Sequence, residues 1–206
     1  KESSEEQQLY RMEQAANYIA TGLQTQLNNS ESALNALAQE LMVQASAGMS
    51  FTDADTLRMT DTVLKTYGFE SVAVCDAKRH AYEEGTEGFD VTEDDAYQKA
   101  LAGKPVLSFQ KYSSTAREEA VVFHVPLIIA GKTEAVIRAA WSSATLESCV
   151  FVSDFRRKEN VFLINQSSLI LYSTQNKFIS DAMFLSLWGE RDAQFREVEQ
   201  VIKQGR

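Results

Sequence analysis

The first part of the chain carries apolar side chains at helical spacing. Between residues 9 and 41 they recur at steps of three and four, interrupted only by Ser30: Leu9, Met12, Ala16, Ile19, Leu23, Leu27, Leu34, Leu37 and Leu41. This spacing lines up one face of an α-helix, and residues 1–66 contain no proline that would stop it. We predict one unbroken helix from about residue 5 to residue 47, packed on a sheet, with part of the stripe left for a partner.

A second helix and then a change of period follow. Gly48 is a suitable end for the first helix. Thr52 or Asp53 can cap a second helix that ends at Tyr67, just before Gly68. From residue 69 onward the apolar residues instead fall in short runs, which are typical of β-strands.

The rest of the chain alternates predicted strands with helices. The segment Thr92-Glu93-Asp94-Asp95 resembles the capped, acidic first turn of a helix that ends at residue 101. A turn at 130–132 joins two strands as a hairpin, and Pro126 belongs at an edge or a bulge. The strands are expected at 69–75, 80–83, 106–112, 120–128, 134–141, 160–165 and 169–173, and further helices at 145–157 and 178–204. This order predicts an α+β fold.

Composition and charge narrow the class of function. The 206 residues are 44% hydrophobic, enough for a buried core, and 29 acidic residues against 20 basic ones give a net charge of −9. A chain this acidic has no electrostatic basis for binding nucleic acid or anionic lipid. We therefore expect no nucleic-acid partner.

Metal and catalytic motifs are missing from the sequence. The two histidines and two cysteines are too few and too scattered for a four-ligand zinc site. Cys75 and Cys149 are interpreted as two free thiols or as a single disulfide. No nucleotide-binding, zinc-protease or serine-hydrolase motif occurs, and neither His80 nor His124 has a nucleophile at a recurring spacing. We expect no enzyme activity, no cofactor and no metal.

Several segments together resemble the Cache family, the extracellular PAS-like sensor domains of bacterial transmembrane receptors. The segments are VAVCD (72–76), DAYQKALAG (95–103), PVLSF (105–109), VVFHVPL (121–127), AGK (130–132) and AVIRAAWSSATLES (135–148). The hairpin at 160–173 resembles the opening of a second, membrane-proximal module. The long helix is similar to the shared backbone helix of double Cache domains.

The resemblance implies a domain layout and a ligand site. We expect a long helix at 1–50 packed on a PAS-like antiparallel module at 51–148, and a linker with an incomplete proximal module at 149–206. In amine- and amino-acid-binding members, the helix carries an Arg-x-Trp-Tyr type of motif and the last strand an Asp for the ligand ammonium. Here Tyr97 matches the final aromatic, Asp94 and Asp95 stand in place of the Arg, Ala96 replaces the Trp, and Ala140 replaces the Asp. These differences argue against an amino-acid ligand.

Strand alternation predicts which side chains share the pocket face. If Ala140 faces the pocket, Arg138 does too, and a two-residue turn at 130–131 or 131–132 sets Phe123 or Val125 opposite Arg138. His124 then lies on the helix side as a packed residue. A guanidinium in an apolar strand needs a partner. The partner of Arg138 is either a protein acid such as Asp94 or Asp95, or the carboxylate or phosphate of a ligand.

Other candidate ligand contacts come from the short helix and the strand after it. Tyr97 either forms an aromatic wall of the pocket or fills the core. Ser108 and Gln110 share one face of their strand, but the sequence does not indicate which face.

The sequence leads to two hypotheses of function. The first is the extracellular, ligand-sensing soluble domain of a membrane-anchored bacterial receptor, which binds a small and possibly anionic molecule and signals along the long helix. In the full-length receptor the N-terminal helix would then form a homodimer. The second is an interaction module that dimerises through this helix and has lost its pocket.

Overall fold

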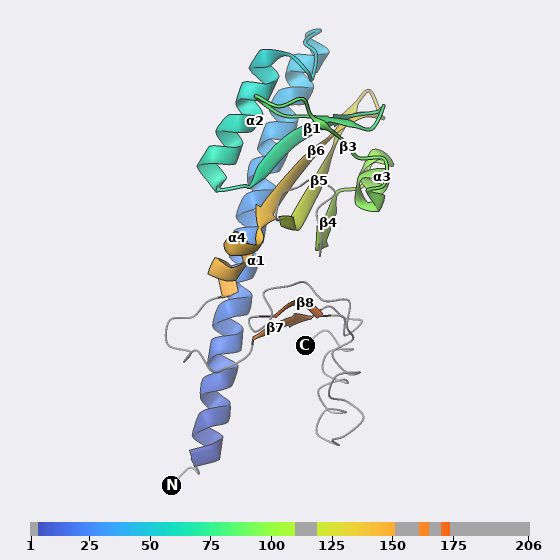
Figure 1. Ribbon diagram of the computed structural model, residues 1–206. Helices are drawn as coiled ribbons and strands as arrows, with labels where there is room; N and C mark the ends of the chain where they lie inside the picture. Colours follow the sequence, from blue (N-terminus) through green and yellow to red (C-terminus); the bar gives the residue numbers. More distant parts are fainter. Residues whose placement is uncertain (1–3, 110–118, 151–160, 165–169, 174–206) are drawn as a thin grey trace.

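A helix that runs the length of the molecule and a six-stranded antiparallel sheet form most of the structure (Figure 1). The computed structural model describes residues 4–109, 119–150, 161–164 and 170–173. Element boundaries and side-chain contacts below refer to these residues.

The long helix α1 spans Ser4–Ser46 without a break, which confirms the prediction. Its apolar stripe is buried toward the C-terminal end, where Leu34 is 0% and Leu41 1% exposed. Near the N-terminus the same stripe is uncovered, since Leu9 is 61% and Met12 50% exposed. The sheet therefore covers only part of the stripe, as expected.

Helix α2 (Ala54–Tyr67) runs back beside α1, and its ends follow the sequence signals. Asp53 occupies the N-cap position, but its side chain makes no capping hydrogen bond to the helix; its carboxylate instead accepts a hydrogen bond from the Ser50 amide. Gly68 ends the helix at φ 68°, in the left-handed region that glycine adopts at little cost. The Phe69 amide then bonds back to the Leu64 carbonyl, and the chain turns into the sheet.

The sheet has the strand order β3-β2-β1-β6-β5-β4, and every neighbouring pair is antiparallel. Its strands are β1 (Ser71–Asp76), β2 (His80–Tyr82), β3 (Phe89–Asp90), β4 (Val106–Phe109), β5 (Glu119–Ile129) and β6 (Lys132–Ser142). All but β3 were predicted, and two residues are too few for a periodic signal. The predicted end of β4, residues 110–112, lies outside the described residues.

A β-bulge in the β5–β6 hairpin overturns part of the predicted register. The turn is Ala130-Gly131, as expected, because Ile129 pairs with Lys132. Ile128 then pairs with Thr133 but Leu127 with Ala135, so Glu134 is an extra residue in β6. One extra residue in β6 shifts every later β5–β6 pair by one position. The residues of β5 that were predicted to lie on the same face of the sheet as Arg138 therefore lie on the opposite face.

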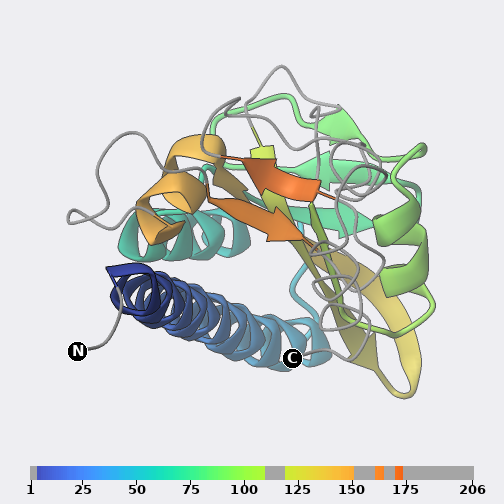
Figure 2. The same cartoon turned by 90° about the horizontal axis from the view of Figure 1, so that it is seen from below.

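Helices cover both faces of the sheet. Figures 1 and 2 show α1 and α2 on one face and α3 (Asp95–Leu101) on the other. The core on the α1 side includes Leu34, Phe123 and Trp141, and the Phe123 and Trp141 rings meet edge to face at 5.4 Å. The core on the α3 side is smaller and built of small residues around Tyr97: Ala73, Cys75, Ala81, Val91, Ala100 and Val136.

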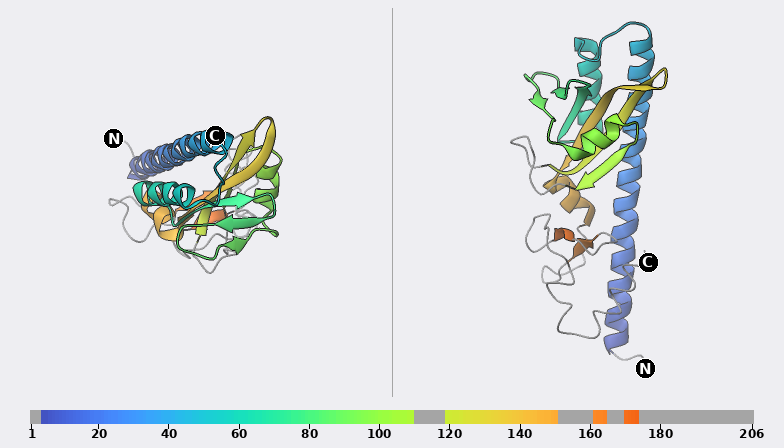
Figure 3. Two further views of the ribbon diagram at one scale, coloured as in Figure 1. Left: turned by 90° about the horizontal axis from the view of Figure 1, so that it is seen from above. Right: turned by 90° about the vertical axis from the view of Figure 1, so that its right-hand side faces the viewer.

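The chain leaves the sheet through α4 (Ser143–Val150) and reaches a separate hairpin. This hairpin consists of β7 (Phe162–Ile164) and β8 (Ile170–Ser173) and lies below the sheet, level with the N-terminal half of α1 (Figure 3). It confirms the second predicted strand pair. The predicted helix at 178–204, the turn at 166–168 and residues 151–157 lie outside the described residues.

Candidate functional site

The site builds up from Asp94, the residue before α3. Its backbone is extended, with φ −86° and ψ 99°, and its Oδ1 accepts hydrogen bonds from the amides of Ala96 and Tyr97. These amides have no partner within the first turn of a helix, so the carboxylate acts as the N-cap that the acidic run predicted. The same side chain is thereby held against the sheet.

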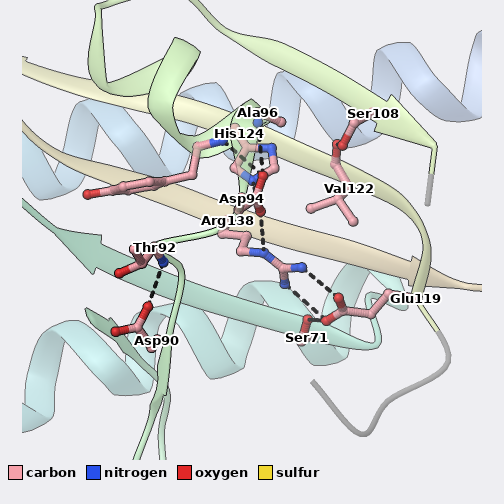
Figure 4. Close-up of polar contacts among 11 residues, drawn as sticks. Ser71, Asp90, Thr92, Asp94, Ala96, Ser108, Glu119, Val122, His124 and Arg138 are labelled. Atoms are coloured by element: carbon pink, nitrogen blue, oxygen red, sulfur yellow. Dashed lines mark hydrogen bonds and ion pairs between the residues drawn. The ribbon is translucent and has the colours of Figure 1, made fainter. Parts of the chain in front are cut away.

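The second carboxylate oxygen of Asp94 joins α3 to two strands. Oδ2 lies 3.1 Å from His124 Nε2 on β5 and 3.5 Å from Arg138 Nε on β6 (Figure 4). The side chains of His124 and Arg138 are 0% exposed, and that of Asp94 is 6% exposed. Asp94 is thus the least buried of the three side chains, although it too is almost fully covered.

Arg138 forms its strongest contact with Glu119. Nη1 lies 3.0 Å from Oε1 and Nη2 lies 2.6 Å from Oε2, so the two planar groups meet through two parallel hydrogen bonds. The Ser71 hydroxyl donates a further bond to Glu119 Oε1 at 3.0 Å. The guanidinium also lies 5.5 Å from the centroid of the Phe89 ring, within the range of a cation–π contact.

A second bulge places Glu119 on this face. Glu119 pairs with Ser142, but Val121 pairs with Trp141, so Ala120 is an extra residue in β5. Without the bulge, Glu119 would share the α1 side with Val121, because side chains two apart point the same way. With it, the carboxylate lies on the face of Arg138 and completes the ion pair.

The neighbours of Asp94 and Arg138 keep both groups ionised despite their burial. Burial by itself raises the pKa of Asp94, but the hydrogen bond and charge of His124, the Tyr97 amide and the charge of Arg138 outweigh it and lower the pKa to about 2. Burial likewise disfavours the charged form of Arg138, but Glu119 and Asp94 raise the pKa of the guanidinium overall. Both groups are therefore ionised at neutral pH.

Of the two partners considered for Arg138, the structure contains the protein acid. Asp94 is one of the two residues named in advance, whereas the other, Asp95, is exposed and makes no contact with the guanidinium. The stronger partner, Glu119, was not anticipated. Because it follows another acid, Glu118, the sequence presents both as part of a charged loop, and only the bulge brings Glu119 inward.

The predicted positions of Phe123, Val125 and His124 are wrong. Arg138 lies opposite His124, while Phe123 faces Ala139 and Val125 faces Ile137. The two apolar residues therefore belong to the α1-side core and do not share the face of Arg138. The cause is the bulge at Glu134, which inverts the alternation of β5 relative to β6.

Of the remaining candidates, Tyr97 and Ser108 lie on the same face of the sheet as Arg138, and Gln110 falls in a part of the chain that is not described. Tyr97 is 0% exposed, packs in the α3-side core and donates its hydroxyl to the Asp76 carbonyl, so its ring and its polar group are both engaged. Ser108 pairs with Val122 and faces the same side as Arg138, and its hydroxyl bonds to the Val122 carbonyl at 3.4 Å. Gln110 lies outside the described residues.

Metal-binding and redox chemistry find no support in the described part of the chain. No group of three or more His, Cys, Asp or Glu side chains there is placed to hold a metal ion. Cys75 and Cys149 are both free thiols. Burial raises the pKa of Cys75 far above its usual range, so this thiol stays protonated and unreactive.

Solved structures share this fold. No protein-family model and no curated protein matches the sequence. The ligand-binding domain of the Campylobacter jejuni chemoreceptor Tlp3, in complex with 4-methylisoleucine, superimposes with a TM-score of 0.66 at 14% identity, over 85% of this chain and 73% of that one.

Two Pseudomonas domains give the same result. The amino-acid chemoreceptor PctC of Pseudomonas aeruginosa, in complex with GABA, has a TM-score of 0.66 at 16% identity, over 87% of this chain and 81% of that one. The chemoreceptor CtaA of Pseudomonas fluorescens, in complex with L-alanine, has a TM-score of 0.68 at 15% identity, over 87% and 77%. The chain therefore has the fold of the ligand-binding domains of bacterial chemoreceptors, as its resemblance to Cache sensor domains implied.

Proposed function

We propose that this chain is the ligand-sensing domain of a bacterial membrane receptor and lies on the extracellular side of the cell membrane. The observation that carries the proposal is the shared fold with chemoreceptor ligand-binding domains over more than four fifths of the chain. Within the described residues, no helix is long and apolar enough to cross a bilayer. The domain works by binding, with no turnover.

The packing of the sheet suggests how binding is transmitted. Strands β5 and β6 carry His124 and Arg138 on the site face and Phe123 and Trp141 on the opposite face, against α1. Because neighbouring side chains on a strand point to opposite faces, a shift of β6 at the site also moves Trp141 against the helix. A ligand that favours one packing therefore changes the position of α1.

The layout of the receptor follows from the same proposal. The helix at 1–50 serves as the backbone, residues 51–148 as the ligand-binding module, and residues 149–206 as a linker and part of a second module. The exposed N-terminal stripe of α1, with Leu9 and Met12, supplies an apolar surface for a homodimer in the full-length receptor. The membrane anchor would provide the effective concentration that this association needs.

A thermal-shift screen of the isolated domain tests ligand sensing. Carboxylates, amines, amino acids, purines and sugars are added singly, and a specific ligand is expected to raise the melting temperature in a saturable way, by mass action. The absence of any shift across the whole set would contradict the proposal.

A second candidate is an interaction module whose pocket has been lost. It is favoured by one observation: Arg138, Glu119 and the Tyr97 hydroxyl are already satisfied by protein groups. In this case no small molecule binds, but the domain self-associates through α1. Sedimentation velocity of the wild type beside Leu9→Glu/Met12→Glu distinguishes the two. An interaction module is expected to self-associate as an isolated domain and to become monomeric when the stripe is charged, whereas a sensing domain without its membrane anchor is expected to be mostly monomeric in both cases.

A further inference from the structure

Arg138 is a buried arginine whose outer end has the donor geometry of an anion-binding site. Nη1 and Nη2 donate parallel hydrogen bonds of 3.0 Å and 2.6 Å to the Glu119 carboxylate, and the Ser71 hydroxyl donates a third, of 3.0 Å, to the same group (Figure 4). All three residues are buried. A guanidinium and a hydroxyl that converge on one planar carboxylate are also the contacts by which proteins bind a carboxylate ligand.

The donors of this site are held in place without Glu119. Ser71 belongs to β1 and Arg138 to β6, and these two strands pair along the whole length of β1. The guanidinium also lies 5.5 Å from the centroid of the Phe89 ring, and its Nε lies 3.5 Å from Asp94 Oδ2. Removal of the Glu119 side chain is therefore expected to leave the donors where they are.

Glu119 supplies the acceptor from the neighbouring strand. It is the first residue of β5, and the bulge at Ala120 turns its side chain to this face. The carboxylate is attached to the chain by a short tether, so its effective concentration beside Arg138 is about millimolar or higher. A free anion that approaches the guanidinium therefore has to compete with an anion that is always present.

Asp94 does not take over this role. Its Oδ1 accepts two amides of α3, and its Oδ2 is shared between His124 Nε2 at 3.1 Å and Arg138 Nε at 3.5 Å, the outer limit for a hydrogen bond. Within the described residues, the hydrogen bonds of Nη1 and Nη2 both go to Glu119. Truncation of Glu119 therefore leaves a cavity lined by two unpaired, positively charged donors, which a small anion of the lost shape can fill.

We propose that Arg138 and Ser71 form an anion-binding site that the chain fills with its own Glu119 carboxylate, and that Glu119 thereby keeps anionic ligands away from Arg138. The second half of this inference rests on the proposed sensing function, since it concerns which ligands the domain accepts. Glu119 is thus a specificity-determining residue. With a small side chain at position 119, the same two donors accept a free carboxylate.

Thermal unfolding of Glu119→Ala in the presence of acetate tests the site. Acetate has the same heavy atoms as the part of the side chain that is removed, and acetamide has the same shape without the charge. We expect Glu119→Ala to unfold at a lower temperature than the wild type. Acetate should raise this temperature in a saturable way, by about 3 °C or more at about ten times the half-saturating concentration. Equal effects of acetate and acetamide, or no effect of acetate beyond that of sodium chloride, would overturn the inference.

Two control variants separate the space from the charge. Glu119→Gln keeps a side chain of the same size, so the site has no room for acetate. Arg138→Met/Glu119→Leu removes the cation that acetate needs. We expect acetate to change the melting temperature of both variants by no more than sodium chloride does. A rise in either one as large as that in Glu119→Ala would show that acetate acts elsewhere and would refute the site.

The wild type provides a measurement that does not require a stable variant. Because Glu119 already fills the site, acetate and sodium chloride should give melting temperatures within about 1 °C of each other. An acetate-specific rise that Arg138→Met abolishes would mean that the site is open, and the inference would be wrong. If Glu119→Ala is unfolded in chloride, far-UV circular dichroism should show that it folds in acetate. Failure to fold in acetate would also count against the site.

The outcomes separate this inference from the proposed function. Stabilisation of Glu119→Ala by acetate, together with no shift for any compound in the screen of the wild type, would support the anion site and contradict ligand sensing. A ligand found in that screen, with no effect of acetate on Glu119→Ala, would support ligand sensing and refute the anion site.

Discussion

The ion pair between Arg138 and Glu119 is expected to show strong coupling in a double-mutant cycle. Both side chains are 0% exposed, and their atoms meet at 3.0 Å and 2.6 Å. At an effective dielectric constant of about 20, two charges at such separations attract by about 4 kcal/mol or more. Taking both out of water costs a comparable amount, so the intact pair adds little net stability.

Removing one partner is different, because the other charge stays buried. Arg138→Met leaves the Glu119 carboxylate without its cation, and we expect a loss of about 3–5 kcal/mol in the free energy of unfolding. With a urea m-value of about 2 kcal/mol per molar, the midpoint falls by about 2 M. The double variant Arg138→Met/Glu119→Leu removes both charges and is expected to be more stable than Arg138→Met alone.

Urea unfolding followed by far-UV circular dichroism measures all four proteins of the cycle. Lys132→Met serves as the control, because its ion pair with Glu134 is on the surface, with the Lys132 side chain 73% exposed, and is worth less than about 1 kcal/mol. Additive effects of the two single changes, or a loss below about 1 kcal/mol for Arg138→Met, would show that the buried pair is not coupled as the geometry requires.

Three further predictions follow from the same packing. The pKa of Asp94 is lowered to about 2 from 3.8, so its ionised form contributes about 2 kcal/mol of stability that is present above pH 4 and is lost as the pH falls toward 2. Between pH 2 and pH 6 the urea midpoint should therefore change less with pH in Asp94→Asn than in the wild type. The same dependence of the midpoint on pH in both proteins would contradict the low pKa. Leu34→Ala, at a site 0% exposed in the α1 core, should lower the free energy of unfolding by about 2–5 kcal/mol. Tyr18→Ala, at a site 70% exposed on the same helix, should lower it by less than about 0.5 kcal/mol. Similar losses for the two variants would mean that α1 is not packed as described. In the native protein a thiol reagent should leave Cys75 unmodified until urea unfolds the domain, because burial raises the pKa of its thiol and excludes the reagent; labelling of Cys75 without denaturant, detected by peptide mass spectrometry, would argue against this core.

Local signals in the sequence were sufficient for most of the elements. The stripe from Leu9 to Leu41 predicts α1 because helical spacing depends only on neighbours three and four residues away. The left-handed stop at Gly68 and the cap at Asp94 are equally local, since each depends on the chemistry of one side chain and the next turn of backbone. The sequence also requires an anionic partner for Arg138, from the protein or from a ligand, because an unpaired buried charge is too costly.

The tertiary structure decided which side chains meet at the site. The extra residues Glu134 and Ala120 sit at two bulges, and each reverses the side of the sheet on which later residues of one strand point relative to the other. A single inserted residue leaves little trace in a period-two pattern when both faces of the strands are buried, as in β5 and β6. Strand identity was therefore predictable, whereas the pairing of Arg138 with His124 and Glu119 depended on cross-strand hydrogen bonds that only the assembled sheet defines.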